Sequence, residues 1–258
     1  MINFDFSGQK ILVTGGSRGI GLGVAEGFIN SGAEVTILAS GNEITEVASK
    51  LSEKYGRCVA ALVCDITDRD AVASSVGGLE RIDVLVNNAG LELITPIDAE
   101  GSEVEETFRR IIDINVMGTY YVTREALPRM HHGGRIILTS SMWGKSAVAE
   151  FSAYCTSKHA NIGFMRSLAH ELAPRGICVN AVCPGWVRTV ASMRSLRAMA
   201  ERENRSEDDV LAEIVDAQAL GGLMEPEDMA ATYLFLASDA ADNITGQAWT
   251  VDRGELMQ

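Results

Sequence analysis

The sequence predicts an α/β fold in which helices cover both faces of a parallel β-sheet. Short apolar runs rich in β-forming residues alternate with amphipathic stretches along most of the chain, and this alternation is typical of such sheets. The runs at 11–13 and 84–86 are apolar at every position, as expected for strands buried on both faces.

Seven strands are expected, at residues 10–14, 34–39, 59–64, 82–86, 135–139, 178–182 and 248–251. Six helical patterns fill the intervals, at residues 20–31, 43–55, 68–76, 104–130, 152–173 and 227–237. The alternation continues without a Pro/Ser linker, a repeat or a low-complexity tract. We therefore expect residues 1–258 to form a single domain, which suits the length of one large α/β unit.

The segment 189–225 breaks this rhythm. It is charged and helix-prone, and it follows the carboxyl end of the sixth expected strand, where open α/β sheets bind their ligands. We interpret it as a mobile substrate lid inserted in the domain; an inert pair of solvated helices is the alternative.

The charge balance argues against two classes of partner. The 258 residues include 22 Lys and Arg against 35 Asp and Glu, a formal net charge of −13. Such a field repels nucleic acid and anionic lipid, and no uncharged run approaches the ~20 residues that span a bilayer. The amino terminus carries Asp5 where a secretory signal would carry base. We expect a cytoplasmic protein that binds neither nucleic acid nor a membrane.

The five cysteines and four histidines lack the spacing of a disulfide framework or a zinc site. No metal site is therefore expected, and the cysteines are interpreted as small apolar residues in a reducing compartment.

A glycine-rich turn, GGSRGIG at residues 15–21, connects the first strand to the first helix. Glycines at such a turn permit a tight bend, let backbone N–H groups approach a pyrophosphate, and allow the helix to pack closely on the strand. The spacing differs from the strict GxGxxG pattern. The turn alone therefore fits a simple tight connection as well as a dinucleotide site.

A second pattern places Tyr154 and Lys158 four residues apart on an expected helix, where they share one face. A free tyrosine has a pKa of ~10, too high for a general base at neutral pH. One cation ~4 Å away can lower that pKa by ~3 units. Taken alone, such a pair is more often an exposed Tyr and Lys on an amphipathic helix.

Six motifs together resemble the short-chain dehydrogenase/reductase family, in its compact single-domain subtype. They are TGxxxGxG at 14–21, NNAG at 87–90, Asn115, Ser141, YxxxK at 154–158 and Pro-Gly at 184–185, and the resemblance extends from Gly8 to Asp252. It implies a Rossmann-type, doubly wound, seven-stranded parallel sheet. It also implies a metal-free, NAD(P)-dependent oxidoreductase that transfers hydride between nicotinamide and a secondary alcohol or carbonyl.

The resemblance implies roles for the matching residues. Tyr154 is the proton donor or acceptor, and Ser141, favoured over the adjacent Ser140 by its spacing, hydrogen bonds the substrate oxygen. Lys158 binds the nicotinamide ribose and lowers the pKa of Tyr154, and Asn115 holds a water of the proton relay. The cofactor-binding residues are Gly15, Ser17, Arg18, Gly19, Ile20, Gly21, Ser40, Asp65, Ile66, Asn87, Ala89, Gly90, Tyr154, Lys158, Pro184, Gly185, Val187 and Thr189.

Two positions depart from the family pattern. Cys155 lies next to the tyrosine, and packing is expected to explain it better than redox control. Arg253 stands where a glycine is common, so it either alters subunit contacts or adds a charge near a neighbouring site.

The end of the second strand favours NADP(H) over NAD(H). NAD-specific sites usually hold the adenosine ribose with an acid there, but this sequence has Ala39 followed by Ser40. Without a carboxylate to repel a 2′-phosphate, Arg18 and Ser40 can bind it. Some NAD-using relatives also lack the acid, so NAD(H) stays open.

The substrate is expected to contact Ser141, Trp143, Glu150, Tyr154 and Trp186. Together with Glu92 and the apolar residues near it, they indicate a small or medium polar molecule. A sugar, polyol, hydroxy acid or 3-oxoacyl group all fit.

Two other functions are weighed against this reading. A catalytically silent NADP(H)-binding regulator typically lacks one of the four catalytic residues, but all four are present here. A dehydratase or dehalogenase typically lacks part of the glycine-rich turn, which is complete in this sequence. The long helices 104–130 and 152–173 match those the family uses for a symmetric interface, so a homotetramer or homodimer is expected.

Overall fold

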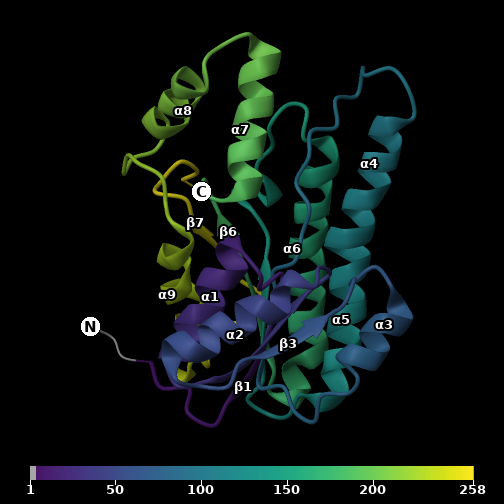
Figure 1. Ribbon diagram of the computed structural model, residues 1–258, viewed down its shortest axis with the longest axis vertical. Coiled ribbons are helices and arrows are strands. Elements are labelled where there is room, and N and C mark those ends of the chain that lie inside the picture. The colour runs from purple at the N-terminus through teal and green to yellow at the C-terminus, as the bar shows by residue number, and fades with distance from the viewer. Residues whose placement is uncertain (1–3, 258) are drawn as a thin grey trace.

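The computed structural model describes residues 4–257; the three residues before them, part of the amino terminus used above to argue against a secretory signal, lie outside that range. A seven-stranded sheet forms the centre (Figure 1), in the order β3-β2-β1-β4-β5-β6-β7. All neighbouring strands are parallel. The strand order reverses between β1 and β4, which confirms the doubly wound, Rossmann-type sheet.

The strands are β1 (Lys10–Thr14), β2 (Glu34–Ala39), β3 (Ala60–Val63), β4 (Val84–Asn87), β5 (Arg135–Thr139), β6 (Cys178–Pro184) and β7 (Ala248–Val251). The α-helices are α1 (Gly19–Asn30), α2 (Glu43–Tyr55), α3 (Arg69–Ser75), α4 (Glu103–Ile112), α5 (Thr119–Ala126), α6 (Ser152–Leu172), α7 (Val190–Glu203), α8 (Glu207–Asp216) and α9 (Ala230–Ala237). The predicted strands therefore all exist, with ends displaced by up to two residues.

Helices cover both faces of the sheet (Figure 1), and each strand supplies side chains to the hydrophobic cores on both faces. In β1, Ile11 and Val13 join a core with side chains of α1, α2 and α9. Leu12, between them, points to the other face and joins a core with side chains of α3, α5 and α6. This two-sided burial is why the strands are apolar at every position.

The expected continuous helix 104–130 is wrong in detail. A π-helical turn at Asp113–Gly118 separates α4 from α5, and a 3₁₀ turn at Leu127–Arg129 follows. Pro128 in this last turn cannot donate the hydrogen bond that an α-helix needs. At the π turn, a Cβ on Gly118 would lie 2.6 Å from Ile66, so the chain approaches the turn after β3 closely here.

The segment 189–225 contains α7 and α8, which stand above the carboxyl ends of the strands (Figure 1). Its two ends are tied together by a β-bridge between Val187 and Met224 and by an ion pair between Arg188 and Glu225 at 2.9 Å. Helix α8 is followed by a stretch that returns to the sheet. The insertion is thus anchored at its base.

Arg253, whose role the sequence left open, holds this returning stretch. Its guanidinium donates to the carbonyls of Leu220 and Gly221, both at 2.5 Å, and its own carbonyl accepts the Leu220 N–H at 2.8 Å. The residue has a left-handed backbone, with φ of 59°, a conformation that explains why glycine is common here.

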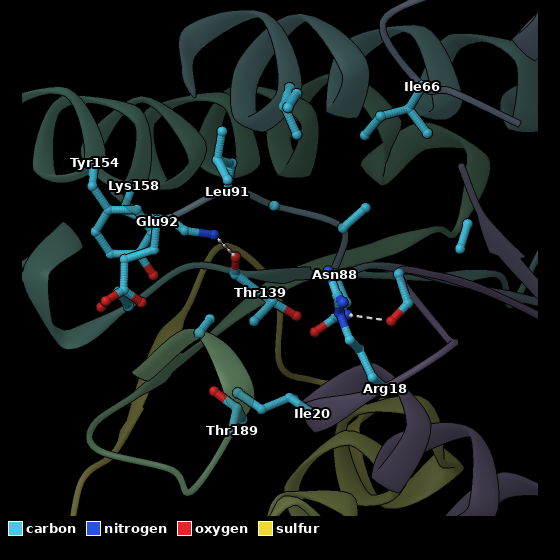
Figure 2. A pocket seen from close by; sticks show the side chains of 18 of the residues that line it. Arg18, Ile20, Ile66, Asn88, Leu91, Glu92, Thr139, Tyr154, Lys158 and Thr189 are labelled. Carbon is cyan, nitrogen blue, oxygen red and sulfur yellow. Dashed lines mark hydrogen bonds between the residues drawn. The ribbon is translucent and has the colours of Figure 1, made fainter. Parts of the chain in front are cut away.

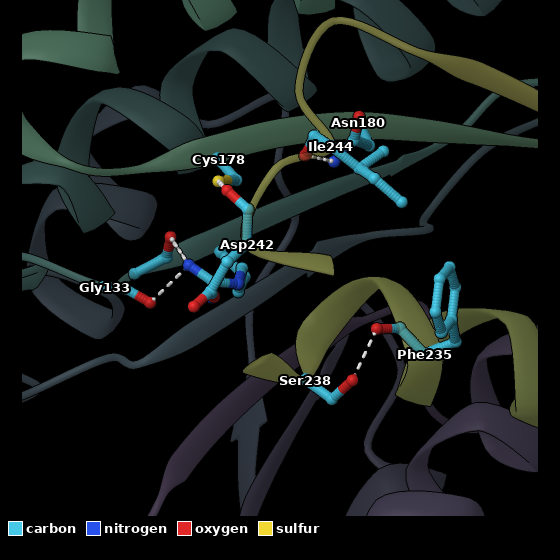
Figure 3. A network of polar contacts seen from close by, with 9 residues as sticks. Gly133, Cys178, Asn180, Phe235, Ser238, Asp242 and Ile244 are labelled. Carbon is cyan, nitrogen blue, oxygen red and sulfur yellow. Dashed lines mark hydrogen bonds and ion pairs between the residues drawn. The ribbon is translucent and has the colours of Figure 1, made fainter. Parts of the chain in front are cut away.

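A separate polar network secures the connection into β7 (Figure 3). The Asn180 amide donates to the Ile244 carbonyl at 2.7 Å and accepts the Gln247 N–H at 3.1 Å. Nearby, the buried Arg135 forms an ion pair with Asp242. These residues lie far from the carboxyl ends of the strands and support the sheet. None of the helices within residues 4–257 has the length and apolar character required to cross a bilayer.

Candidate active site

A cavity of about 960 Å³ opens at the carboxyl ends of the strands (Figure 2), lined by the turns that follow β1 to β6 and by the starts of α6 and α7. The predicted site residues that line it are Gly15, Ser17, Arg18, Gly19, Ile20, Ser40, Asp65, Ile66, Ala89, Gly90, Ser141, Trp143, Tyr154, Lys158, Pro184, Gly185, Trp186, Val187 and Thr189. Four predicted residues, Gly21, Asn87, Asn115 and Glu150, do not line it. Residues separated by up to 174 positions, from Gly15 to Thr189, thus converge on one space.

The glycine-rich turn forms one end of the cavity. Gly15 and Gly19 have φ of 68° and 56°, values that glycine adopts without strain. Gly21 supports the turn from behind, because a Cβ there would lie 2.3 Å from the Gly15 carbonyl oxygen. The turn is therefore built from glycines for shape, and only two of these three line the cavity.

Hydrogen bonds join this turn to the turn after β4. The Thr14 hydroxyl accepts the N–H groups of Asn88 and Ala89, each at 3.0 Å. The Asn88 amide in turn donates to the Thr14 carbonyl at 3.0 Å and to the Gly15 carbonyl at 3.4 Å. The sequence analysis gave Thr14 and Asn88 no role of their own, although both belong to the motifs it identified.

The amino terminus of α1 faces the cavity beside these glycines. Its cap residue, Arg18, makes no side-chain capping hydrogen bond, and the first turn holds no acidic residue. The free N–H groups and the positive end of the helix dipole therefore suit an anion such as a pyrophosphate.

The residues after β2 extend the cavity away from α1. Ala39 and Ser40 line it as expected, and Glu43, at the start of α2, lines it too. Glu43 was not among the predicted site residues, because the sequence indicates only that it begins a helix. It places a carboxylate near the position where Arg18 and Ser40 were expected to meet a phosphate.

Asn87, predicted to be one of the cofactor-binding residues, does not line the cavity. Asn87 is buried, and its amide donates to the Thr123 hydroxyl on α5 at 2.9 Å, so it points behind the cavity wall. Asp65 and Ile66 do line the cavity. The Asp65 carboxylate accepts both the N–H and the hydroxyl of Thr67, at 2.9 and 2.8 Å.

Tyr154 and Lys158 project into the cavity from the first turns of α6 (Figure 2). The Lys158 ammonium donates to the Thr139 carbonyl at 2.8 Å and lies 5.4 Å from the centre of the Tyr154 ring. Only 4% of Lys158 is exposed, and this burial lowers its pKa to about 8. The burial of Lys158 therefore opposes its positive charge, and the hydrogen bond to Thr139 fixes its ammonium beside the phenol.

The pKa of Tyr154 is raised in this arrangement, and not lowered as the sequence analysis expected. Burial is the main cause, the nearby Glu92 carboxylate adds to it, and a hydrogen bond with Ser141 opposes it. The ammonium of Lys158 is directed at the Thr139 carbonyl instead of the phenol. The phenol of Tyr154 is therefore protonated and can donate a hydrogen bond.

Asn115 lies on the π turn, fully buried behind the cavity wall. Its side-chain oxygen Oδ1 accepts the Leu91 N–H at 2.7 Å, and its side-chain amide donates to the Leu91 carbonyl and the Ser157 hydroxyl, each at 2.9 Å. The structure thus assigns it a clamp on the loop after β4. Its role as the holder of a relay water stays a prediction.

Aromatic rings enclose the cavity around the tyrosine. Trp143 meets Tyr154 and Trp186 edge to face, with ring centres 6.1 and 5.8 Å apart. Cys155 is buried in the same apolar cluster, and burial raises its thiol pKa. Packing therefore accounts for this cysteine, as predicted.

Glu150 does not reach the substrate side of the cavity, contrary to the prediction. Its carboxylate accepts from the Arg202 guanidinium of α7 at 2.6 Å and forms an ion pair with it. A left-handed backbone at Glu150, with φ of 67°, directs the chain outward here. Glu150 thus connects the rim to the 189–225 segment.

Residues 4–257 contain no cluster of three His, Cys, Asp or Glu side chains placed to hold a metal ion. The cavity instead combines an anion-binding turn at one end with hydroxyl donors and a buried ammonium at the other. That combination suits a phosphate-bearing cofactor and a reaction in which negative charge develops on an oxygen.

Comparisons with known proteins agree with this geometry. A family model described as Enoyl-(Acyl carrier protein) reductase matches residues 15–255. The D-beta-hydroxybutyrate dehydrogenase of Cupriavidus necator is 34% identical, with 98% of this chain and 99% of that protein covered. The oxidoreductase UcpA of Escherichia coli strain K12 is 36% identical, with 97% and 95% covered.

Solved structures are similar over nearly their whole length. L-sorbose reductase from Gluconobacter frateurii, complexed with NADPH and L-sorbose, superposes with a TM-score of 0.90 at 28% identity, and both chains are covered completely. A putative NAD(P)-dependent gluconate 5-dehydrogenase from Beutenbergia cavernae, with bound NADP, gives a TM-score of 0.86 at 33% identity, with 98% of each chain covered.

The depressed pKa of Lys158 predicts a pH-dependent stability. The group has a pKa of about 8 when folded and 10.5 as its ordinary value, so the unfolded chain binds more protons between these pH values. The free energy of unfolding therefore rises with pH across this window, by up to about 3 kcal/mol from this lysine. Lys158→Met should remove this contribution, measured by urea unfolding at several pH values. Parallel pH profiles of the two proteins would contradict the prediction.

Proposed function

Because the chain belongs to the short-chain dehydrogenase/reductase family and is an NAD(P)-dependent enzyme of it, we propose the following reaction. The protein transfers a hydride between a nicotinamide cofactor and the secondary alcohol or carbonyl of a small or medium polar substrate, such as a sugar, polyol, hydroxy acid or 3-oxoacyl group. The observation that carries the proposal is the convergence of Ser141, Tyr154 and Lys158 in the cavity that the glycine turn opens.

The residues present fit a dinucleotide. The uncapped start of α1 and the left-handed Gly15 and Gly19 leave room and N–H donors for a pyrophosphate. Asp65 and Ile66 extend the cavity on the adenosine side, and the Pro184-Gly185 turn extends it on the nicotinamide side. When bound, the nicotinamide supplies or accepts the hydride.

In the reductive direction, negative charge develops on the substrate oxygen. The hydroxyls of Ser141 and Tyr154 share a hydrogen bond, so both can donate to one oxygen between them. Tyr154 then gives its proton; its raised pKa means that the phenol carries this proton before the transfer. Lys158 binds the ribose and supplies positive charge beside the phenol, while Asn115 keeps the loop after β4 in place.

We propose that residues 1–258 form one domain in which the segment 189–225 acts as a lid. Its base is fixed by the Val187–Met224 bridge, and its start lines the cavity. Thr189 supports the proposed lid, because it connects the cavity to α7. It lines the cavity, and it caps the start of α7 through a reciprocal capping box with Ser192. Closure over a bound substrate would exclude water.

NADP(H) is the preferred cofactor in this proposal. Arg18 and Ser40 line the cavity beside Ala39, which offers no carboxylate to repel a 2′-phosphate. The carboxylate of Glu43 acts in the opposite sense and reduces the preference. NADPH- and NADP-bound relatives are consistent with the proposal.

Tyr154→Phe should lose turnover by ~10²–10⁴, the contribution typical of a general acid–base group. The variant keeps the ring and its packing on Trp143, so binding of NADPH should change little. Turnover and the dissociation constant of NADPH are measured on the same preparation. Retention of more than about a tenth of wild-type kcat would show that another group moves the proton.

Three variants test the choice of cofactor. Ala39→Asp should shift the preference toward NAD(H), because it adds a ribose acceptor and repels a phosphate. Arg18→Ala should weaken NADP(H) more than NAD(H), by roughly the 1.5–3 kcal/mol of a hydrogen bond to a charged group. Glu43→Gln should strengthen NADP(H) selectively.

The measurements are KM and Kd for both cofactors in the wild type and the three variants. A wild type that prefers NAD(H), together with an Arg18→Ala variant that weakens both cofactors equally, would show that Arg18 is only a loop residue.

We propose a homotetramer or homodimer, supported by an apolar face on α5 and α6. Tyr120 of α5 is exposed there, and its ring meets that of Phe164 of α6 edge to face, with ring centres 6.3 Å apart. Sedimentation at micromolar concentration should give the mass of two or four chains. Tyr120→Glu should lower that mass, and a monomeric wild type would contradict the proposal.

A further inference from the structure

One carboxylate faces the reacting end of the cavity and has no role in the proposed mechanism. Glu92, on the loop after β4, lines the cavity, and Figure 2 shows its side chain in the same region as Tyr154 and Lys158. Its charge acts on both of those groups. Any substrate oxygen placed at Tyr154 therefore lies near a carboxylate.

The position of Glu92 is fixed from both sides. Asn115 binds the N–H and the carbonyl of the preceding residue, Leu91. The Glu92 carbonyl accepts from the Arg194 guanidinium of α7 at 2.6 Å, and the carboxyl hydrogen bonds to Ser195 of the same helix. These contacts hold the Glu92 side chain in a fixed position at the cavity.

Two cations, Lys158 and Arg194, act on the Glu92 carboxylate. Lys158 is engaged by the Thr139 carbonyl, and Arg194 is exposed and does not line the cavity. The other charged lining residues within 4–257 come from the turns after β1 to β3, from α4 and from the π turn: Arg18, Glu43, Asp65, Glu106, Arg109, Arg110 and Asp113. The reacting end therefore holds one carboxylate, Glu92, and one ammonium, Lys158, whose hydrogen bond is made to the Thr139 carbonyl and not to Glu92.

The walls beside Glu92 are aromatic, formed by Trp143 and Trp186. An ionised carboxylate only accepts hydrogen bonds, and each of its two oxygens can accept from a hydroxyl of the substrate. Flat aromatic walls pack against C–H groups and provide little compensation for a second negative charge. This environment suits hydroxyl-bearing, uncharged molecules.

We infer that Glu92 selects neutral polyhydroxylated substrates, a polyol or its ketose, and excludes carboxylate-bearing hydroxy acids. Hydroxyls next to the reacting carbon donate to the Glu92 carboxylate while Tyr154 and Ser141 bind the reacting oxygen. The inference rests on the proposed oxidoreductase function and chooses among the substrate classes left open there. A like charge ~5 Å away at an effective dielectric of ~20 corresponds to roughly a hundredfold discrimination.

The test compares matched substrates that differ by one charge, with NADP⁺ and NAD⁺ reduction followed at about pH 9, because burial raises the pKa of Glu92 above that of an ordinary glutamate and a high pH favours its ionised form. The pairs are pentitols and hexitols with the aldonates of the same configuration, and butane-1,3-diol with 3-hydroxybutyrate. Wild-type kcat/KM should favour the neutral member by roughly a hundredfold. Binding of NADPH is measured separately, without a substrate.

Glu92→Gln should reduce this ratio to within about tenfold, chiefly by improving the acids, because it removes the charge and keeps the shape. The control is Glu207→Gln, the same change on α8, where the carboxylate pairs with Arg197 at 3.1 Å and does not line the cavity. It should keep the wild-type ratio. Melting temperature and NADPH affinity show whether each variant is folded.

Equal or better turnover of the acids by the wild type would overturn the inference and leave the proposed function standing. An unchanged ratio in folded Glu92→Gln would overturn the role of this residue, and so would absence of turnover of every polyol by protein that binds NADPH. Failure to bind either nicotinamide cofactor would instead overturn the proposed function.

Discussion

The hydrogen bonds that join the turn after β1 to the turn after β4 fix the rest of the cavity. Strand order reverses at these two strands, so their turns diverge and leave a crevice. Thr14 and Asn88 hold the two turns together at 3.0 Å, and the glycine turn and the loop bearing Leu91 depart from this junction. Asn115 then fixes Leu91 from the π turn. The position of an anion-binding turn relative to a phenol is therefore set by side-chain-to-backbone hydrogen bonds between segments far apart in the sequence.

The reacting end of the cavity is an arrangement of three ionisable groups, the buried Lys158 and the half-buried Tyr154 and Glu92, whose pKa values depend on one another. Burial alone lowers the pKa of Lys158 and raises those of Tyr154 and Glu92. The carboxylate and the ammonium favour each other's charged form, whereas the carboxylate opposes ionisation of the phenol. Thr139 gives the ammonium a fixed acceptor, and the Thr139 hydroxyl is itself held by the buried Tyr233 at 2.7 Å. The phenol therefore remains protonated while the cation beside it is held in place.

The sequence was sufficient for the sheet, the glycine turn and the convergence of Ser141, Tyr154 and Lys158, because these depend on periodicity and on motifs with a fixed spacing. It failed where a side chain's direction depends on a tertiary contact. Asn87 belongs to a motif that lines the cavity, yet Thr123 on a distant helix turns it away. The π turn at Asn115 could not be read from an unbroken amphipathic pattern. Glu150 was predicted to contact the substrate and Glu92 was not, yet Glu92 lines the cavity whereas Glu150 forms an ion pair with Arg202 outside it.

The same contrast separates the scaffold from the parts that determine specificity. Groups that act on the reacting oxygen lie on β5 and α6, which are held by the core, whereas Glu92 lies on a loop whose outer contacts are with α7. Arg194 binds the loop, Arg202 binds the rim, and Arg253 holds the returning stretch after α8. These arginines attach one segment to three places around the cavity. A change in the position of α7 therefore changes the carboxylate that faces the substrate and leaves the proton donor where it is, so selectivity can vary without rebuilding the catalytic groups.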